Sequence, residues 1–517
     1  MTLEDRAEKG FTTDQDELTD DLEEHTGEGH TPDALAPEQS AATVIAPTDT
    51  GAEHPRHPID LSILDERPGP GRPREYHFPR FERQTLANGL TVVHAHVPGR
   101  ALLAAQLLLP GGGWTEPADR AGVTLLTGRA MPEGTARRDA NEFIEAGERL
   151  GAEIHADATW ETLSASVEVP RSKFGPALAL LAEMVTQPAF PGHEVERLRD
   201  ERMNDLLQAW SDPRRRAERV FPEQIFSPAT PYSRPLGGIQ STIRPLDRHA
   251  LAERHAQMLN PAAATLVVAG DLTGMPFEQL IEEHLGQWSA GPAARAAASQ
   301  ATVEERPGGA RVVLVDRPGA PQSELRIGHV GVPRGVDDFH AISVLNAILG
   351  GTFNSRLNRV IREERGYSYG ITSAFDMRRR AGPFVIRTAV ETAATAPAVI
   401  EILNIVRNFA AAEVEPDELR TARDYLVGVF PLRFESAAQV ASALGGLMVF
   451  ELPDDELDRY RPSIAAVSAA DIRAAAARHI RPDDMVITVI GDAAQIEPAL
   501  RAAELGELTL VAHDTSE

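Results

Sequence analysis

The 517-residue chain contains no cysteine. This absence excludes disulfides, thiolate catalysis and cysteine-ligated zinc, and it permits a reducing compartment. No apolar run approaches the roughly 18 residues that a membrane-spanning helix needs. The first residues, MTLEDRAEKGF, lack a basic segment followed by an apolar one, so we expect no signal peptide and a cytoplasmic location.

Basic residues are outnumbered by acidic ones, 51 to 77. The net charge is −26, while the apolar fraction of 42% and the charged fraction of 25% are those of an ordinary soluble globular protein. Residues 1–60 hold sixteen acidic and three basic residues, a net charge of −13 and half of the total. Such a surface repels nucleic acid, so we expect no polyanionic partner.

The first 80 residues are polar, acidic and rich in proline and glycine, without sustained periodicity. Low hydrophobicity with high net charge predicts a disordered acidic tail, followed by a proline-rich linker that enters the first domain. His25 and His30 lie in this tail, where no fold fixes them as metal ligands. From residue 84 onward, strand-like and helix-like segments follow one another regularly.

The second half of the chain repeats the first. Gly89–Gly99 reappears as Gly309–Gly319, the helix from Ala121 as one from Ala341, and Gly270-Asp271 as Gly491-Asp492, with offsets of 220 to 221 residues. A constant offset across separated landmarks indicates a tandem duplication of one α/β unit. Runs of strands followed by runs of helices favour an α+β sandwich with a largely antiparallel sheet, two of which would form a clamshell around a cavity.

The expected organisation has five parts. A tail and linker span 1–80, a first domain 81–288, a linker rich in alanine and other small residues 289–305, a second domain 306–505 and a short tail 506–517.

Several segments carry a family resemblance when taken together. They are the glycine-rich strand end Pro110–Gly113, the helix-like stretch 121–135 (AGVTLLTGRAMPEGT), the segment 231–237 (PYSRPLG), and 350–370 (GGTFNSRLNRVIREERGYSYG). In this order and at these separations they resemble the insulinase/pitrilysin family of zinc peptidases, in its bacterial processing-peptidase-like branch. The resemblance spans residues 84–505 and implies two tandem domains of the insulinase/processing-peptidase type.

Active members of that family carry His-x-x-Glu-His on the helix that corresponds to 121–135. Two histidines four residues apart lie on one helix face and bind zinc, and the glutamate deprotonates the metal-bound water. Here Leu125, Gly128 and Arg129 stand at the three motif positions, and none of them can do this chemistry. Glu201 and Asp205 lie in the region of the family's third ligand. We therefore expect no metal site and no catalytic residue in this chain.

Other candidate metal or catalytic sites in the sequence have little support. His249 and Glu253 share a helix face, but His255 falls off it, which favours a charged surface helix. His193-Glu194 is typical of a helix N-terminus. There is no Gly-x-Ser-x-Gly nucleophile elbow.

The resemblance implies substrate-binding residues in the second half. In members that cleave peptides, an arginine and a tyrosine of the C-terminal repeat reach the substrate, and the matching positions here are Arg356 and Tyr369. A guanidinium can bind a peptide carbonyl, and a phenol can donate to an oxyanion. The competing interpretation is that Arg356 pairs with Glu363 or Glu364 and that Tyr369 packs at the start of a strand.

Three hypotheses follow. The favoured one is a non-catalytic, substrate-binding subunit of a heteromeric zinc endopeptidase, inactive alone, whose paralogous partner supplies zinc and general base for peptides or unfolded polypeptide. The alternative is a structural or assembly protein with a peptidase-like fold. Nothing in the sequence supports the third, an independent hydrolase with an unrecognised site.

Overall fold

The computed structural model describes residues 71, 74–291, 293–294, 301–309 and 311–512. The chain divides into two units, Met1–Gly71 and Arg72–Glu517, and the second holds the fold described below. The expected acidic tail up to residue 70, and residues 292 and 295–300 of the expected linker, lie outside the described residues. Among the described helices, none has the length and apolarity to span a bilayer.

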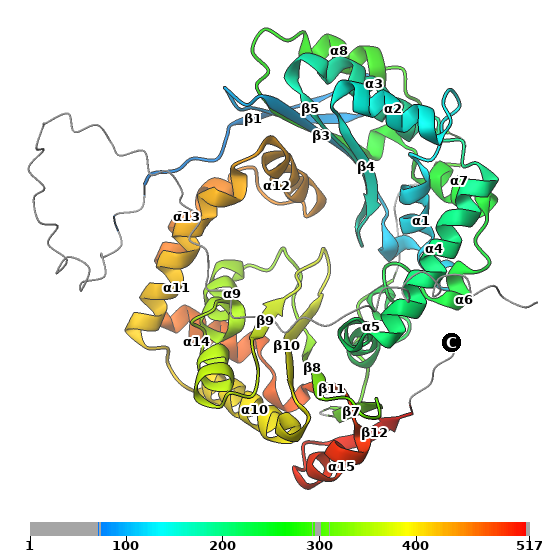
Figure 1. The fold of residues 1–517 in the computed structure, drawn as a ribbon. Coiled ribbons are helices and arrows are strands. Elements are labelled where there is room, and N and C mark those ends of the chain that lie inside the picture. The colour runs from blue at the N-terminus through cyan, green and yellow to red at the C-terminus, as the bar shows by residue number, and fades with distance from the viewer. Residues whose placement is uncertain (1–70, 72–73, 292, 295–300, 310, 513–517) are drawn as a thin grey trace, which may run out of the picture. The chain divides into compact units, whose positions relative to one another are not determined.

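The first half is built on a six-stranded sheet of order β1-β2-β6-β3-β5-β4 (Figure 1). Its pairs are antiparallel except β2 with β6, which is parallel. The strands are β1 Phe81–Thr85, β2 Thr91–His96, β3 Leu102–Pro110, β4 Glu153–Ala158, β5 Thr162–Pro170 and β6 Thr265–Gly270. The helices are α1 Val123–Ala130, α2 Ala140–Leu150, α3 Phe174–Thr186, α4 Gly192–Ser211, α5 Pro213–Ile225, α6 Gln240–Ile243, α7 Arg248–Met258 and α8 Phe277–Leu285.

Local sequence signals explain several of these boundaries. Asp139 and Glu142 form a capping box at the start of α2, and Gly151 ends this helix with a positive φ of 63°. Asp212 caps α5 by accepting a hydrogen bond from the backbone N–H of Arg215, and Pro213 occupies the first helical position.

The second half repeats this plan with a sheet of order β12-β7-β11-β8-β10-β9. The strands are β7 Arg311–Asp316, β8 Gln322–Val330, β9 Ile371–Phe375, β10 Pro383–Glu391, β11 Val486–Gly491 and β12 Glu507–Val511. The α-helices are α9 Phe339–Asn346, α10 Thr395–Ala411, α11 Pro416–Val429, α12 Ala437–Val449, α13 Glu456–Ala466, α14 Ala469–His479 and α15 Ala493–Ala502. Two π-helical segments, η7 Ala347–Gly351 and η8 Asn358–Glu364, separate α9 from β9.

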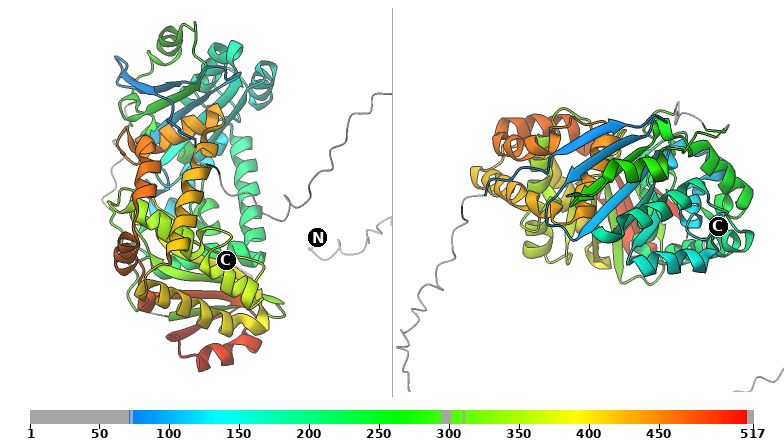
Figure 2. Two further views of the ribbon diagram at one scale, coloured as in Figure 1. Left: turned by 90° about the vertical axis from the view of Figure 1, so that its left-hand side faces the viewer. Right: turned by 90° about the horizontal axis from the view of Figure 1, so that it is seen from above.

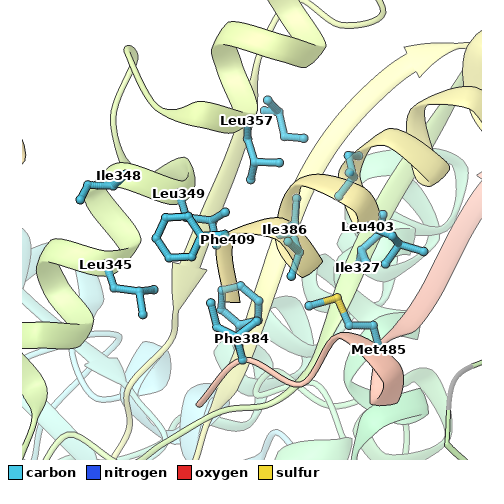
Figure 3. Packing of buried hydrophobic residues seen from close by; sticks show 14 of the residues in the cluster. Ile327, Leu345, Ile348, Leu349, Leu357, Phe384, Ile386, Leu403, Phe409 and Met485 are labelled. Atoms are coloured by element: carbon cyan, nitrogen blue, oxygen red, sulfur yellow. The ribbon is translucent and has the colours of Figure 1, made fainter. Parts of the chain in front are cut away.

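The predicted duplication and α+β class are confirmed. Strands β2-β6-β3-β5-β4 correspond in order and direction to β7-β11-β8-β10-β9. The halves differ at one edge, where β1 joins β2 antiparallel but β12 joins β7 parallel. Each sheet has its main core on one face, and in the second half the core gathers around Phe384, Ile386 and Phe409 (Figure 3).

The other face of each sheet is covered by a helix from the opposite half (Figures 1 and 2). Helix α12 packs on β3, β6 and β2, and its Val440 and Leu444 join Val93 and Val267 in one apolar cluster. Reciprocally, α5 packs on β11 and β8, where Ala217 contacts the cluster of Val315 and Ile490. Each half therefore keeps its own main core and contributes a helix to an apolar cluster on the other half's sheet.

Two predicted boundaries were wrong. Residues 74–80 belong to the fold, because Phe78 is buried against Phe434 and its backbone N–H donates to Asp458. Residues 507–511 are not a tail, because they form edge strand β12, whose backbone pairs with β7. Residues 74–80 are mostly polar, and 507–511 (ELTLV) alternate over only five residues, so neither segment is long enough to give a strong periodic signal.

Candidate functional site

Helix α1 keeps a well-capped N-terminus. The buried carboxylate of Glu116 accepts hydrogen bonds from the backbone N–H groups of Gly122 (2.8 Å) and Thr124 (2.7 Å). Burial raises the pKa of Glu116, and these hydrogen bonds oppose the rise. Arg254 donates to the Thr124 hydroxyl and to the carbonyls of Gly111 and Gly112. An anion at the positive end of the helix fixes α1 against the glycine-rich strand end.

The three motif positions on α1 face different surroundings. Leu125 is half-buried and packs against the first core, Gly128 is buried and Arg129 is exposed. A Cβ atom on Gly128 would lie 2.8 Å from Cδ1 of the buried Leu163. A glutamate in the place of the general base therefore requires Leu163 on β5 to move.

The carboxylates on α4 are already paired. Glu201 accepts a hydrogen bond from Arg197 at 2.7 Å. Asp205 accepts hydrogen bonds from Arg215 at 2.6 Å and from Arg202. Burial raises the pKa of Asp205, but the bond from Arg215 and the charge of Arg202 lower it more, and the net pKa is below its ordinary value.

The positive charge of Arg202, a residue of α4, lies beside α1. Arg202 is mostly buried and donates from Nε to the carbonyl of Gly237 at 3.0 Å. A Cβ on Gly237 would lie 3.0 Å from Cδ2 of Leu125, so the guanidinium lies close to the motif face of α1. Burial lowers the pKa of Arg202, Asp205 raises it, and the charge of Arg129 lowers it further.

These residues do not fit a zinc ion. Leucine, glycine and arginine provide no ligand at the motif positions, and two arginine charges lie where the ion would need anionic or neutral donors. Over the described ranges, no three histidine, aspartate or glutamate side chains gather as a metal site would require.

Helix α7 directs its three candidate residues to different neighbours. His255 is buried and its Nε2 lies 2.7 Å from the carbonyl oxygen of Val185. Glu253 pairs with Arg120 at 2.9 Å, while His249 is exposed. They form no common site.

Tyr369 lies on the turn before β9 and is 94% exposed. At the end of this turn, the Asn358 side chain donates to the carbonyl of Ile371 (2.7 Å) and accepts from the backbone N–H of Ile371 (3.2 Å). Ser368 donates to the carbonyl of Gly370 (2.8 Å) and accepts from the hydroxyl of Thr388. The exposed phenol is thus carried on an anchored backbone.

The structure brings Arg362, not Arg356, to Tyr369. The guanidinium carbon of Arg362 lies 5.5 Å from the centre of the Tyr369 ring and 4.3 Å from that of Phe353. Phe353 is 63% exposed. Arg362 belongs to π-helix η8, a type of distortion that often accompanies functional sites. We refer to Phe353, Arg362 and Tyr369 as the aromatic–arginine cluster.

Arg356 is engaged elsewhere. Its Nε and one terminal nitrogen donate to the two carboxylate oxygens of Glu418 on α11, at 2.9 and 2.7 Å. Its guanidinium carbon lies 4.9 Å from the centre of the Phe409 ring. The pairing with Glu363 or Glu364 that the sequence suggested is replaced by this bidentate pair. The substrate role of Arg356 stays a prediction.

Sequence reasoning missed Arg362 for a definite reason. Arginines stand at 356, 359, 362 and 365, one every third position, so spacing alone does not select among them. The π-helical geometry of η8 decides which of them faces Tyr369, and a single sequence gave no signal for it.

Comparison with known proteins gives the same family for both halves. The family model described as insulinase (peptidase family M16) matches residues 91–237, and that described as peptidase M16 inactive domain matches 245–426. An uncharacterized zinc protease of Mycobacterium leprae is 26% identical over 363 residues, covering 70% of this chain and 81% of that protein. A non-peptidase homolog of Helicobacter pylori is 22% identical over 392 residues, covering 75% and 88%.

Solved structures show the same fold. A peptidase M16 inactive domain from Pseudomonas fluorescens superposes with a TM-score of 0.73 at 24% identity, covering 80% of this chain and 98% of that one. A protease from Helicobacter pylori also gives a TM-score of 0.73, at 17% identity, with coverage of 80% and 100%. With both family models matched in order and the motif positions of α1 substituted, the chain belongs to the insulinase (peptidase M16) family as an inactive member.

Proposed function

We propose that this chain is a non-catalytic, substrate-binding subunit of a heteromeric zinc endopeptidase. A paralogous partner chain would supply the zinc and the general base, and the substrates would be peptides or unfolded polypeptide. The observation that carries the proposal is a contrast between the halves: α1 cannot hold zinc, while the second half presents an exposed aromatic–arginine cluster on an anchored turn.

The chemistry of the aromatic–arginine cluster suits an extended peptide. The guanidinium carbon of Arg362 lies over two rings, and an arginine in such a contact can still donate from its N–H groups to a peptide carbonyl. The exposed rings of Phe353 and Tyr369 offer apolar area that a ligand can cover. These groups bind a peptide without cleaving it, so cleavage requires the partner.

The relatives are consistent with a division of labour. One is named a non-peptidase homolog and others are named zinc proteases. An inactive and an active chain of one family are what a heteromeric enzyme would contain. We propose that both act in the cytoplasm, and that this chain has no cofactor of its own.

The test is reconstitution with a similar chain that carries an intact His-x-x-Glu-His. We expect the mixture to cleave unstructured peptides faster than the partner alone. Arg362→Gln should lower kcat/KM about tenfold, because a charged hydrogen bond to the peptide is lost. Arg359→Gln is the matched control, since this arginine on the same π-helix is exposed and its ion pair with Glu364 is 3.7 Å long.

The results separate the two functions. A mixture no more active than the partner alone would refute the proposal. If the chains associate stably without any gain in peptide cleavage, the alternative of a structural or assembly protein is supported instead.

A further inference from the structure

A second basic feature lies in the first half, away from the aromatic–arginine cluster. A cavity of about 340 Å³ lies between α4, α5 and the segment 231–236, and Trp160 and one side chain from the second half also line it. Six arginines line this arginine cavity: Arg202, Arg215, Arg216, Arg219, Arg234 and Arg378. Glu218 is the one acidic residue among its lining residues. In a chain with 77 acidic and 51 basic residues, such a concentration of positive charge is far from average.

The acidic groups near the arginine cavity are already engaged. Glu218 accepts hydrogen bonds from Arg326 (3.0 Å) and Arg387 (3.1 Å), which reach it from the second sheet. Asp205 is shared by Arg202 and Arg215, as described above. Arg219 and Arg378 also have carboxylate partners, Glu223 at 3.6 Å and Asp376, so the nearby carboxylates are held by arginines and none of them is free to occupy the cavity.

Two of the lining guanidinium groups keep unused donors. Within the described residues, the Arg234 side chain makes no hydrogen bond or ion pair, and burial lowers its pKa while the charge of Glu116 raises it. Arg378 pairs with Asp376 through Nε and one terminal nitrogen, but its other terminal nitrogen is buried without an acceptor in the described structure. Buried donors without acceptors are unfavourable unless a ligand satisfies them.

Aromatic rings lie against several of these cations. Trp210 lies under Arg216 (4.3 Å) and Arg219 (4.9 Å), measured from guanidinium carbon to ring centre. Arg378 lies over Tyr232 at 4.4 Å. A guanidinium that lies over an aromatic ring can still donate from its N–H groups to a planar oxyanion. The aromatic walls also offer apolar contact to whatever carries the anion.

We propose that the arginine cavity binds the carboxylates of an acidic peptide segment. Arg234 and Arg378 supply the free donors, and the half-buried rings of Trp160 and Trp210 pack against the aliphatic part of the peptide. The cavity adjoins the motif face of α1 through Arg202 and Gly237, so an acidic segment bound there lies beside the place where active relatives hold zinc. This assignment of a peptide rests on the proposed function, and it gives the subunit a preference for acidic substrates.

The experiment measures binding to the full chain without any partner. Tryptophan fluorescence is the readout, because two of the four tryptophans line the cavity. The probes are a glutamate-rich peptide, the same peptide with glutamine at every glutamate, and inorganic phosphate. We expect the glutamate peptide to bind at least about tenfold more tightly than the glutamine peptide, with an affinity that falls as salt rises.

Variants tie the binding to the arginine cavity. Arg234→Gln should weaken binding of the glutamate peptide about tenfold with little change in stability, because among the described residues the Arg234 side chain has no hydrogen bond or ion pair to lose and only the charge of Glu116 acts on it. Arg407→Gln is the control, an exposed arginine whose ion pair with Asp483 is 3.8 Å long and lies outside the cavity.

Three results would overturn the proposal. They are equal affinity for the glutamate and glutamine peptides, unchanged affinity in Arg234→Gln, and phosphate binding tighter than the peptide, which would assign the site to a free phosphate. The proposed function is judged separately, by peptide cleavage in the reconstituted pair. An acidic preference with no gain in cleavage therefore refutes only the subunit role.

Discussion

Replacing Arg356 with alanine should destabilise the protein strongly at neutral pH. The guanidinium makes two hydrogen bonds to Glu418, and the two side chains are only 16% and 23% exposed. Hydrogen bonds to charged groups contribute about 1.5–3 kcal/mol, and breaking a fully buried pair costs about 3–5 kcal/mol. Since this pair is only partly buried, we expect the free energy of unfolding to fall by about 2–3 kcal/mol.

The loss should depend on pH in a defined direction. The hydrogen bond from Arg356 is the main cause of a lowered pKa of Glu418, and burial opposes it. A carboxyl group whose pKa is lower in the folded state stabilises that state above its unfolded pKa of about 4.3. This contribution disappears as the pH falls through the folded pKa. The difference between wild type and Arg356→Ala should therefore shrink below about pH 4.

Urea unfolding followed by circular dichroism at pH 7.5, 5 and 3.5 measures both effects. Arg359→Ala serves as the control, because its side chain is 55% exposed and should change stability by less than about 1 kcal/mol. Equal losses in the two variants, or a loss for Arg356→Ala that persists unchanged at pH 3.5, would show that the pair with Glu418 does not hold this region together.

Three further predictions concern other parts of the fold. Gly128→Glu should lower the free energy of unfolding by about 1–3 kcal/mol, measured by urea unfolding, because the new side chain displaces Leu163. His329 accepts a hydrogen bond from the backbone N–H of Arg481, and burial lowers its pKa to about 4. The free energy of unfolding should therefore fall as the pH drops from about 6.5 to 4, and His329→Gln should flatten this slope in unfolding experiments. Gly445→Val should lower the melting temperature, because a Cβ there already lies 3.0 Å from a side chain on β3.

The sequence was sufficient for the architecture of each half. The repeated segments Gly89–Gly99 and Gly309–Gly319 contain strands β2 and β7, and these two strands occupy the same place in their sheets. The exchange of α5 and α12 between the halves was not predictable. A face made of Val93 and Val267 requires an apolar helix but does not specify which one, and the helix that covers it comes from more than 160 residues away.

The candidate site was predictable by region and not by residue. The substitutions at Leu125, Gly128 and Arg129 follow from the sequence, since none of these side chains can bind zinc. The pairing of Arg356 with Glu418 could not be foreseen, because the two residues are 62 positions apart and no periodicity joins them. The arginine cavity could not be predicted either, because Arg202, Arg234 and Arg378 come from separate segments of the sequence.

The reciprocal covering of the sheets determines what each half can do alone. A half expressed by itself would expose the apolar face of its own sheet and also an apolar helix meant for its sibling, which favours aggregation over folding. Cutting the chain between residues 289 and 305 should release neither fragment, since α5 and α12 continue to hold them together. The two repeats are therefore arranged like the subunits of a domain-swapped dimer, and they should unfold together in one cooperative transition.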